Sequence, residues 1–371
     1  MHPVGTDLLT ASFRGHGYNA VSLTKEDQST FQRGKSCLRG SECLPAATTL
    51  GSFLDYYNNY KEEEDQETSL FMPCASGPCR FGQYSTIHQM VLNRLQINTS
   101  LLSFNSENNY REISGSLRLL IMKSIIITDI IIKLGCRVRP YVAEPQKVDH
   151  ILKEYTEILV QSLERKNSLK KVLRLLGNDL KSIKPNLTNS KPLVGIVGEI
   201  YVRSSPFSND NLVNKIEQHG AEVWLSPFME WFHYTAWLKS KKNNSIVEKF
   251  TDQVTGSIVL YIETGYYKIF NDFLKNRIEP TTEEIIELAE PYISSSIRGE
   301  AILTIGRTIN FIREGAKLIV NVAPFSCMPG NISSTILRRI SEDYSIPIIS
   351  LYYDGFTNFD QQLKTYLNNL K

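Results

Sequence analysis

Short apolar runs alternate with amphipathic stretches in the second half of the chain. The run Leu193–Val202 has the length and composition of a buried strand, and Asn209–His219 after it has the spacing of a helix. Gly220 ends that helix, and the segment AEVWLSP predicts the next strand. Two further strands are predicted at Lys317–Ala323 and Ile346–Tyr352. A strand, a helix and a second strand in succession indicate a parallel sheet.

Helical spacing fills most of the chain around these strands. We expect helices at Trp231–Lys241, Ser245–Leu274, Thr282–Leu288, Arg298–Arg313, Asn331–Ile340 and Asn358–Leu370. This half is therefore predicted to be a doubly wound α/β domain with a helical insertion.

The first half repeats the same unit in a weaker form. Asp7–Leu23 and Asn211–Leu225 both read as a helix, then His-Gly, then a strand, but little chain precedes the first copy. Leu70–Met72 predicts a strand, Gln83–Leu95 a helix, and Leu95–Phe104 contains another strand. The expected fold class is α/β, with two doubly wound parallel-sheet domains of the Rossmann or flavodoxin type and helical insertions. In the first of these domains we expect the helix to come first, whereas in the second a strand precedes the corresponding helix.

Helices and a linker separate the two predicted domains. Glu112–Leu134 reads as one long, mostly apolar helix, and Asp149–Ile183 as one or two charged helices. Lys184–Pro192 is polar, contains two prolines and is interpreted as a linker. We expect an N-terminal α/β domain at 1–148, a helical connector and linker at 149–191, and a C-terminal α/β domain with a helical insertion at 192–371.

Composition restricts the class of protein. Of the 371 residues, 42% are hydrophobic and 22% are charged, which excludes a disordered chain, a coiled coil or a collagen-like fibre. The net charge of +2 gives no support to nucleic-acid binding. The most apolar window, Leu117–Leu134, carries four charged residues, so no membrane span is expected. The start of the chain has no signal-peptide pattern, and we expect a cytoplasmic protein without membrane or nucleic-acid partners.

Cysteines are the main clue to chemistry. They lie in GKSCLRGSECLPA, FMPCASGPCRFGQY, LGCRVRPY and VAPFSCMPG, as Cys37, Cys43, Cys74, Cys79, Cys136 and Cys327. In the cytoplasm they are not expected to form disulfides. Cys74, Cys79 and Cys327 follow predicted strands in Pro/Gly turns, where ligands gather in open α/β sheets. Thiolates bind soft metals and iron–sulfur clusters, but a zinc site or buried thiols also agree with the spacing. Cys136 lacks such a turn, and a structural role is as plausible for it as ligation.

Three charged residues near these turns are candidates for binding a cofactor. Glu199 and Arg203 follow a predicted strand; they form either a buried ion pair or, for Arg203, a contact to an anionic ligand. Arg80 follows Cys79 and either offsets the negative charge of a thiolate-bound cluster or pairs with an acid. The sequence contains no GxxxxGK[ST] and no GxSxG motif, so we do not expect this chain to hydrolyse ATP by itself.

Several longer motifs resemble a known family. GSECLPA, MPCASGPCRFGQY, RVRPY, VGIVGEIYVRSSPFSND, GAEVWLSPFMEW, GEAILTIG and VAPFSCMPG followed by YYDG are similar to the uncharacterised branch of the 2-hydroxyacyl-CoA dehydratase family. That branch occurs as the C-terminal part of CoA-substrate-specific enzyme activases and is related to double-cubane cluster proteins. The resemblance covers nearly the whole chain.

The resemblance implies a cofactor and a partner. It implies α/β domains that hold an iron–sulfur cluster, of the [4Fe-4S] or double-cubane type, on Cys43, Cys74, Cys79 and Cys327, with Cys37 in the same first motif. Cys136 matches no motif of the family. A separate ATP-hydrolysing activator, itself an iron–sulfur protein, would inject a low-potential electron, and an oxygen-avoiding organism is implied.

Three hypotheses of function follow. The first is an iron–sulfur protein that accepts electrons from the activator, for reduction or dehydration of a small-molecule or acyl-CoA substrate. The second is a true 2-hydroxyacyl-CoA dehydratase subunit, which is a lyase. The third is not an enzyme but an iron–sulfur scaffold or regulatory partner of an activase. An oligomer is compatible with all three.

Overall fold

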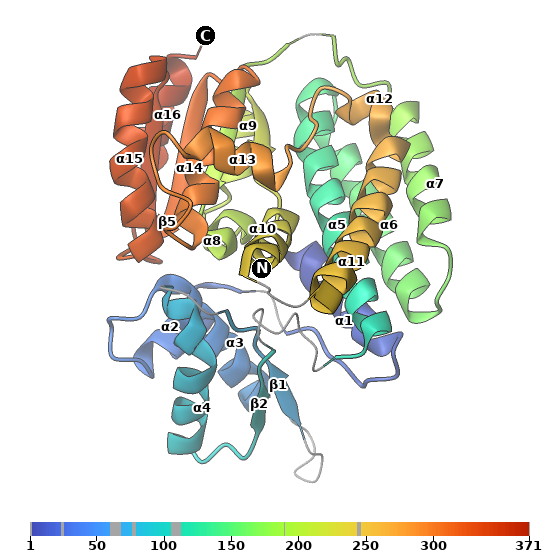
Figure 1. Ribbon diagram of the computed structural model, residues 1–371, viewed down its shortest axis with the longest axis vertical. Helices are drawn as coiled ribbons and strands as arrows, with labels where there is room; N and C mark the ends of the chain where they lie inside the picture. Colours follow the sequence, from blue (N-terminus) through green and yellow to red (C-terminus); the bar gives the residue numbers. More distant parts are fainter. Residues whose placement is uncertain are drawn as a thin grey trace.

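The computed structural model describes residues 2–23, 26–59, 68–75, 79–104, 113–188, 190–242 and 246–370. Three groups of elements are visible in Figure 1: a sheet with its helices, a layer of long helices beside it, and a smaller lobe below both. All described strand pairs are parallel. The expectation of a mixed α/β fold with parallel sheets is therefore confirmed.

The C-terminal lobe is built on a four-stranded sheet. Its strands are β3 (Leu193–Gly198), β4 (Glu222–Leu225), β5 (Leu318–Pro324) and β6 (Ile348–Tyr353), in the spatial order β4-β3-β5-β6. The order of connection reverses between β3 and β5. In open α/β sheets ligands bind at such a switch point, beyond the carboxyl ends of the strands.

Short and long helices complete this lobe. Their bounds are α8 (Ile200–Ser204), α9 (Leu212–Gln218), α10 (Met229–Lys242), α13 (Thr282–Ala289), α14 (Glu300–Arg313), α15 (Met328–Tyr344) and α16 (Asp360–Asn368). Strands β3 and β5 are buried along their whole length, as the continuous apolar runs predict for central parallel strands.

The helical layer shares one apolar core. It contains α1 (Pro3–Arg14), α5 (Gly115–Val138), α6 (Pro145–Glu164), α7 (Leu169–Ser182), α11 (Ile246–Tyr267) and α12 (Asn271–Leu274). Helix α5 packs against this core on one side and also against β4, which explains why its sequence is apolar over most of its circumference. In the described residues no helix is both long and apolar enough to cross a membrane.

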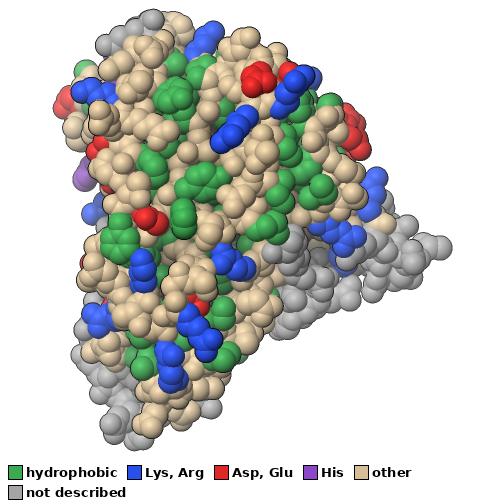
Figure 2. Space-filling model, turned by 90° about the vertical axis from the view of Figure 1, so that its left-hand side faces the viewer, with side chains coloured by type: hydrophobic (Ala, Val, Ile, Leu, Met, Phe, Trp, Pro, Cys, Tyr) green, Lys and Arg blue, Asp and Glu red, His purple; other side chains and the backbone are tan. Residues whose placement is uncertain are grey.

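The N-terminal lobe is smaller. It holds α2 (Gln28–Ser36), α3 (Leu44–Asn59), α4 (Tyr84–Arg94) and two short strands, β1 (Ser69–Phe71) and β2 (Ser100–Leu102). Figure 2 shows the face on which this lobe lies below the C-terminal lobe: Lys and Arg side chains gather over its lower half, and hydrophobic side chains form separate patches.

Aromatic contacts fix the N-terminal lobe against the sheet. The ring of Phe31 in α2 lies 5.6 Å from that of Phe356, in the turn after β6. Gly355 has a φ of +85°, and a Cβ there would lie 2.4 Å from the Phe31 ring, so the turn requires glycine. Lys35 also lies over the Phe356 ring, 4.2 Å from its centre. These contacts hold α2 and α3 at the carboxyl edge of the sheet.

Two predicted strands differ from the structure. The run Leu193–Val202 is a strand only to Gly198, because Glu199 caps a new helix there. Residues 19–23 form no strand, so the first copy of the helix–His-Gly–strand unit ends after its helix and turn. Helix α1 instead packs against α5 and α6. The two doubly wound domains and their boundaries stay a prediction.

Close packing of α2 on α3 gives a testable prediction. A Cβ at Gly51 would lie 1.8 Å from the carbonyl oxygen of Thr30 in α2. We expect Gly51→Ala to push the helices apart and to lower the free energy of unfolding by about 1–3 kcal/mol, measured by urea denaturation. Gly256→Ala is the matched control, since that helix position has open space and should gain stability. An unchanged midpoint for Gly51→Ala would contradict the packing argument.

Candidate functional site

Three cysteine-bearing segments border one cavity between the N-terminal lobe, the sheet and α5. The cavity has a volume of about 1320 Å³, and Cys43, Cys79 and Cys327 all line it. These residues come from widely separated parts of the chain. The structure therefore brings together one thiol from each of the three segments that sequence analysis singled out.

Each of the three thiols lies at the beginning of a helix. Cys43 directly precedes α3, Cys79 caps the 3₁₀ helix η1 (Arg80–Gln83), and Cys327 caps α15. The Phe81 N–H points at Cys79 Sγ, 3.5 Å away. Helix N-termini carry partial positive charge, which favours thiolates and other anions. The cavity is therefore bordered by three thiols that each lie next to a helix N-terminus.

Arg80 ties the three segments together. Its guanidinium donates to the Ser41 carbonyl oxygen at 2.5 Å, two residues before Cys43, and to the Ser326 carbonyl oxygen at 2.7 Å, next to Cys327. No acidic partner of Arg80 is found in the described ranges. Its observed role is to cross-link the loops that carry the thiols.

Desolvation keeps all three thiols protonated. It raises the pKa of Cys43 and Cys327, and it raises the pKa of Cys79 to about 12. Cys43 Sγ also lies 2.5 Å from the hydroxyl oxygen of Tyr84, a residue that sequence reasoning missed. Burial, and then the neighbouring Cys43, raise the pKa of Tyr84 well above its usual value, so this phenol stays a hydrogen-bond donor. A bound cation would be needed to favour the thiolate form.

Glu199 and Glu300 form a charged wall of the cavity next to the thiols, and Arg203 contacts Glu300 from outside the lining. Glu199 does not pair with Arg203: its carboxylate accepts from the N–H groups of Tyr201 and Val202. Arg203 is buried and pairs with Glu300 at 3.3 Å. The predicted buried Arg–Glu pair thus exists, but with a different glutamate.

Glu300 was missed as a site residue, although it lies within the motif GEAILTIG. It borders the cavity at the start of α14. Burial, and then the nearby Glu199, raise the pKa of Glu300 to about 8.

The other predicted ligands lie outside the lining of the cavity in the described residues. Cys74 lies beside the 3₁₀ helix η1, with its Sγ 3.4 Å from the Gly82 carbonyl oxygen. Cys37 ends α2 and packs into the core of the N-terminal lobe. Cys136 is buried between α5 and the sheet core, with Arg139 as its neighbour. Cys74 is thus close to the helix that Cys79 begins, whereas Cys136 belongs to the core.

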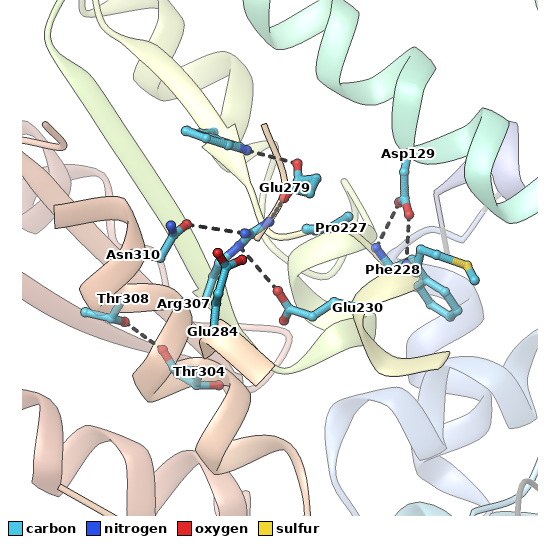
Figure 3. A network of polar contacts seen from close by, with 12 residues as sticks. Asp129, Pro227, Phe228, Glu230, Glu279, Glu284, Thr304, Arg307, Thr308 and Asn310 are labelled. Carbon is cyan, nitrogen blue, oxygen red and sulfur yellow. Dashed lines mark hydrogen bonds and ion pairs between the residues drawn. The ribbon is translucent and has the colours of Figure 1, made fainter. Parts of the chain in front are cut away.

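A buried network of charged side chains supports the far wall of the cavity (Figure 3). Arg307, which is 1% exposed, contacts Glu279 and lies 3.3 Å from Glu230 and 3.3 Å from Asn310. Lys133 contacts Glu279 as well. This network joins α5, α10 and α14.

Asp129 holds the start of α10 in the same view. Its carboxylate accepts from the N–H groups of Phe228 and Met229 at 2.9 and 2.8 Å. Burial raises its pKa to about 7.

The described residues include no group of three or more His, Cys, Asp or Glu side chains placed to hold a metal ion. That result favours neither a cluster nor free thiols, because the thiolates of a cluster bind different irons and need not surround one point. Neither the family models nor the curated proteins contain a match to this chain.

Proposed function

We propose that this chain is an iron–sulfur protein that accepts low-potential electrons from an ATP-hydrolysing activator and passes them to a small-molecule or acyl-CoA substrate. One observation carries the proposal: three thiols from distant segments begin helices around one cavity, beside the switch point of a parallel sheet. The donor set suits an iron–sulfur cluster, since all three are soft ligands and Cys74 can supply a fourth.

The family resemblance is part of the proposal. The chain would belong to the uncharacterised branch of the 2-hydroxyacyl-CoA dehydratase family, with two doubly wound domains around a cluster, in the cytoplasm. Its motifs support this, because residues of GSECLPA, MPCASGPCRFGQY, VGIVGEIYVRSSPFSND, GAEVWLSPFMEW, GEAILTIG and VAPFSCMPG border the cavity. Shared motifs that gather around one cavity are expected where they serve one site.

The residues of this chain would divide the work. Cys43, Cys79 and Cys327 bind iron, and Arg80 holds their three loops in register. The Tyr84 hydroxyl lies next to Cys43 Sγ and would donate to an iron-bound thiolate there, and hydrogen bonds to sulfur raise the reduction potential of a cluster. When bound, the cluster supplies one-electron transfer at a potential set by burial and by those hydrogen bonds.

Electron transfer from an activator tests this function. The protein, purified without oxygen, is mixed with an ATP-hydrolysing iron–sulfur activator in the presence and absence of ATP. We expect its visible absorption to bleach only when ATP is present. A cluster that keeps its oxidation state with ATP would contradict electron transfer and support the scaffold alternative. Turnover of a 2-hydroxyacyl-CoA ester in the same mixture would identify a dehydratase.

A further inference from the structure

The cavity wall next to the carboxyl edge of β3 and β4 carries an excess of negative charge. Among the described residues that line the cavity, seven are acidic and only two are Lys or Arg. One of those two, Lys133, is already bonded to Glu279 and to the Arg277 carbonyl oxygen. This part of the cavity wall therefore favours a cation over an anion.

Glu199, Ser226 and Glu300 lie close together in this wall. The Arg203 guanidinium contacts the Gly198 carbonyl oxygen, the Pro227 carbonyl oxygen and Glu300. The Arg203 guanidinium thus bonds to Glu300, to the residue before Glu199 and to the residue after Ser226. Arg203 itself does not line the cavity.

Burial makes the ionised form of three carboxyl groups at this wall unfavourable. Glu199 and Asp129 accept backbone N–H groups and form no ion pair within the described part of the chain. Burial raises the pKa of Asp129, Glu199 and Glu300, and it outweighs Arg203, which acts to lower the pKa of all three. A cationic ligand would stabilise the ionised carboxylates.

Ser226 is an independent sign of a ligand. It follows β4, is only 2% exposed and lines the cavity. Its hydroxyl has no hydrogen-bond partner among the residues that the structure describes. A buried polar group without a partner is unfavourable and rare in native proteins. A ligand in the cavity would satisfy it.

Aromatic side chains show which kind of cation suits this wall. Tyr201, Phe228, Trp231 and Tyr267 line the same cavity. Their faces attract cations and also cover hydrocarbon. A metal ion would instead need several oxygen ligands around one point, and the described carboxylates are not grouped in that way.

We propose that this part of the cavity binds a small organic ammonium ion. Its nitrogen faces the carboxylates of Glu199 and Glu300 and the hydroxyl of Ser226, and its hydrocarbon part packs on the aromatic wall. The proposal does not depend on the iron–sulfur function, because none of these residues is a thiol.

Three probes with the same ring test the charge preference. Titration calorimetry is carried out on the purified protein with benzylamine, benzyl alcohol and benzoate, and iron is measured in the same samples. We expect benzylamine to bind at least about tenfold more tightly than benzyl alcohol, and benzoate not to bind. Equal affinities for the three probes, or no binding of benzylamine, would overturn the proposal.

Two variants place the site. Glu300→Gln keeps the shape of the side chain and should weaken benzylamine binding about tenfold, and Ser226→Ala should weaken it about threefold. Glu342→Gln, at an exposed position of α15, should leave it unchanged. If Glu300→Gln does not fold, benzylamine binding by Ser226→Ala and the three-probe comparison on the unmodified protein still test whether an ammonium ion binds at this wall. Full benzylamine affinity in a folded Glu300→Gln variant would also overturn the proposal.

Discussion

Arg307→Met will lower the free energy of unfolding by about 3–5 kcal/mol, because it leaves buried carboxylates without their partner. Arg307 is almost fully buried and contacts both Glu230 and Glu279. Methionine fills most of the volume of the arginine side chain. The lost stability is therefore due more to the missing charge than to poorer packing. Chemical denaturation followed by circular dichroism measures it.

An exposed ion pair provides the control. Arg339 pairs with Asp343 at 2.9 Å, but its side chain is 70% exposed. Arg339→Met should change stability by less than about 1 kcal/mol, because water screens such pairs. A similar loss of unfolding free energy in Arg307→Met and Arg339→Met would mean that burial does not determine how much an ion pair contributes to stability.

A second substitution separates charge from packing at Arg307. Adding Glu230→Gln to Arg307→Met removes one of the carboxylates left unpaired, so we expect it to restore part of the lost stability. A further loss in the double variant would show that packing, not charge, dominates at this position.

Cys327→Ala will remove most of the iron from the anaerobically purified protein. Cys327 borders the cavity at the start of α15 and comes from a different segment than the other two lining thiols. A cluster that loses one of its thiolates is usually lost or converted. Iron and acid-labile sulfide per chain measure the effect, and Cys43→Ala and Cys79→Ala should behave in the same way.

Cys136→Ala is the matched control for this series. Its thiol is buried in the core between α5 and the sheet, away from the cavity lining. We expect unchanged iron and a modest loss of stability from the smaller side chain. Equal iron in the Cys327 and Cys136 variants would remove Cys327 from the ligand set.

Periodicity predicted the strands and helices of the second half well, because its central strands are long apolar runs bounded by glycine and helix signals. It failed where one apolar run continues from the end of a strand into the following helix. Ile200–Val202 are as apolar as β3, but Gly198 has a φ of +108° and Glu199 caps α8. Similarly, residues 19–23 have a strand-like pattern but no neighbouring strand with which to pair.

The site was predictable only in part, for the same local reason. The cysteine-bearing motifs are visible in the sequence. Three of their thiols line one cavity, those of Cys43, Cys79 and Cys327. The partner of Arg203 was not predictable from spacing, because Glu300 is distant in sequence and only the fold brings it near. Tyr84 had no signal beyond its place in a cysteine motif. Cys136 already differed in the sequence, because it lacks a Pro/Gly turn, and the fold places it in the core between α5 and the sheet.

Iron and acid-labile sulfide per chain, with an electron paramagnetic resonance spectrum of the dithionite-reduced protein, decide whether the cavity thiols hold a cluster. The protein is purified and reconstituted under strict anaerobiosis. We predict about four irons and four sulfides per chain, with the spectrum of a reduced cubane cluster on the cavity thiols. A protein that contains no iron after reconstitution would contradict this prediction.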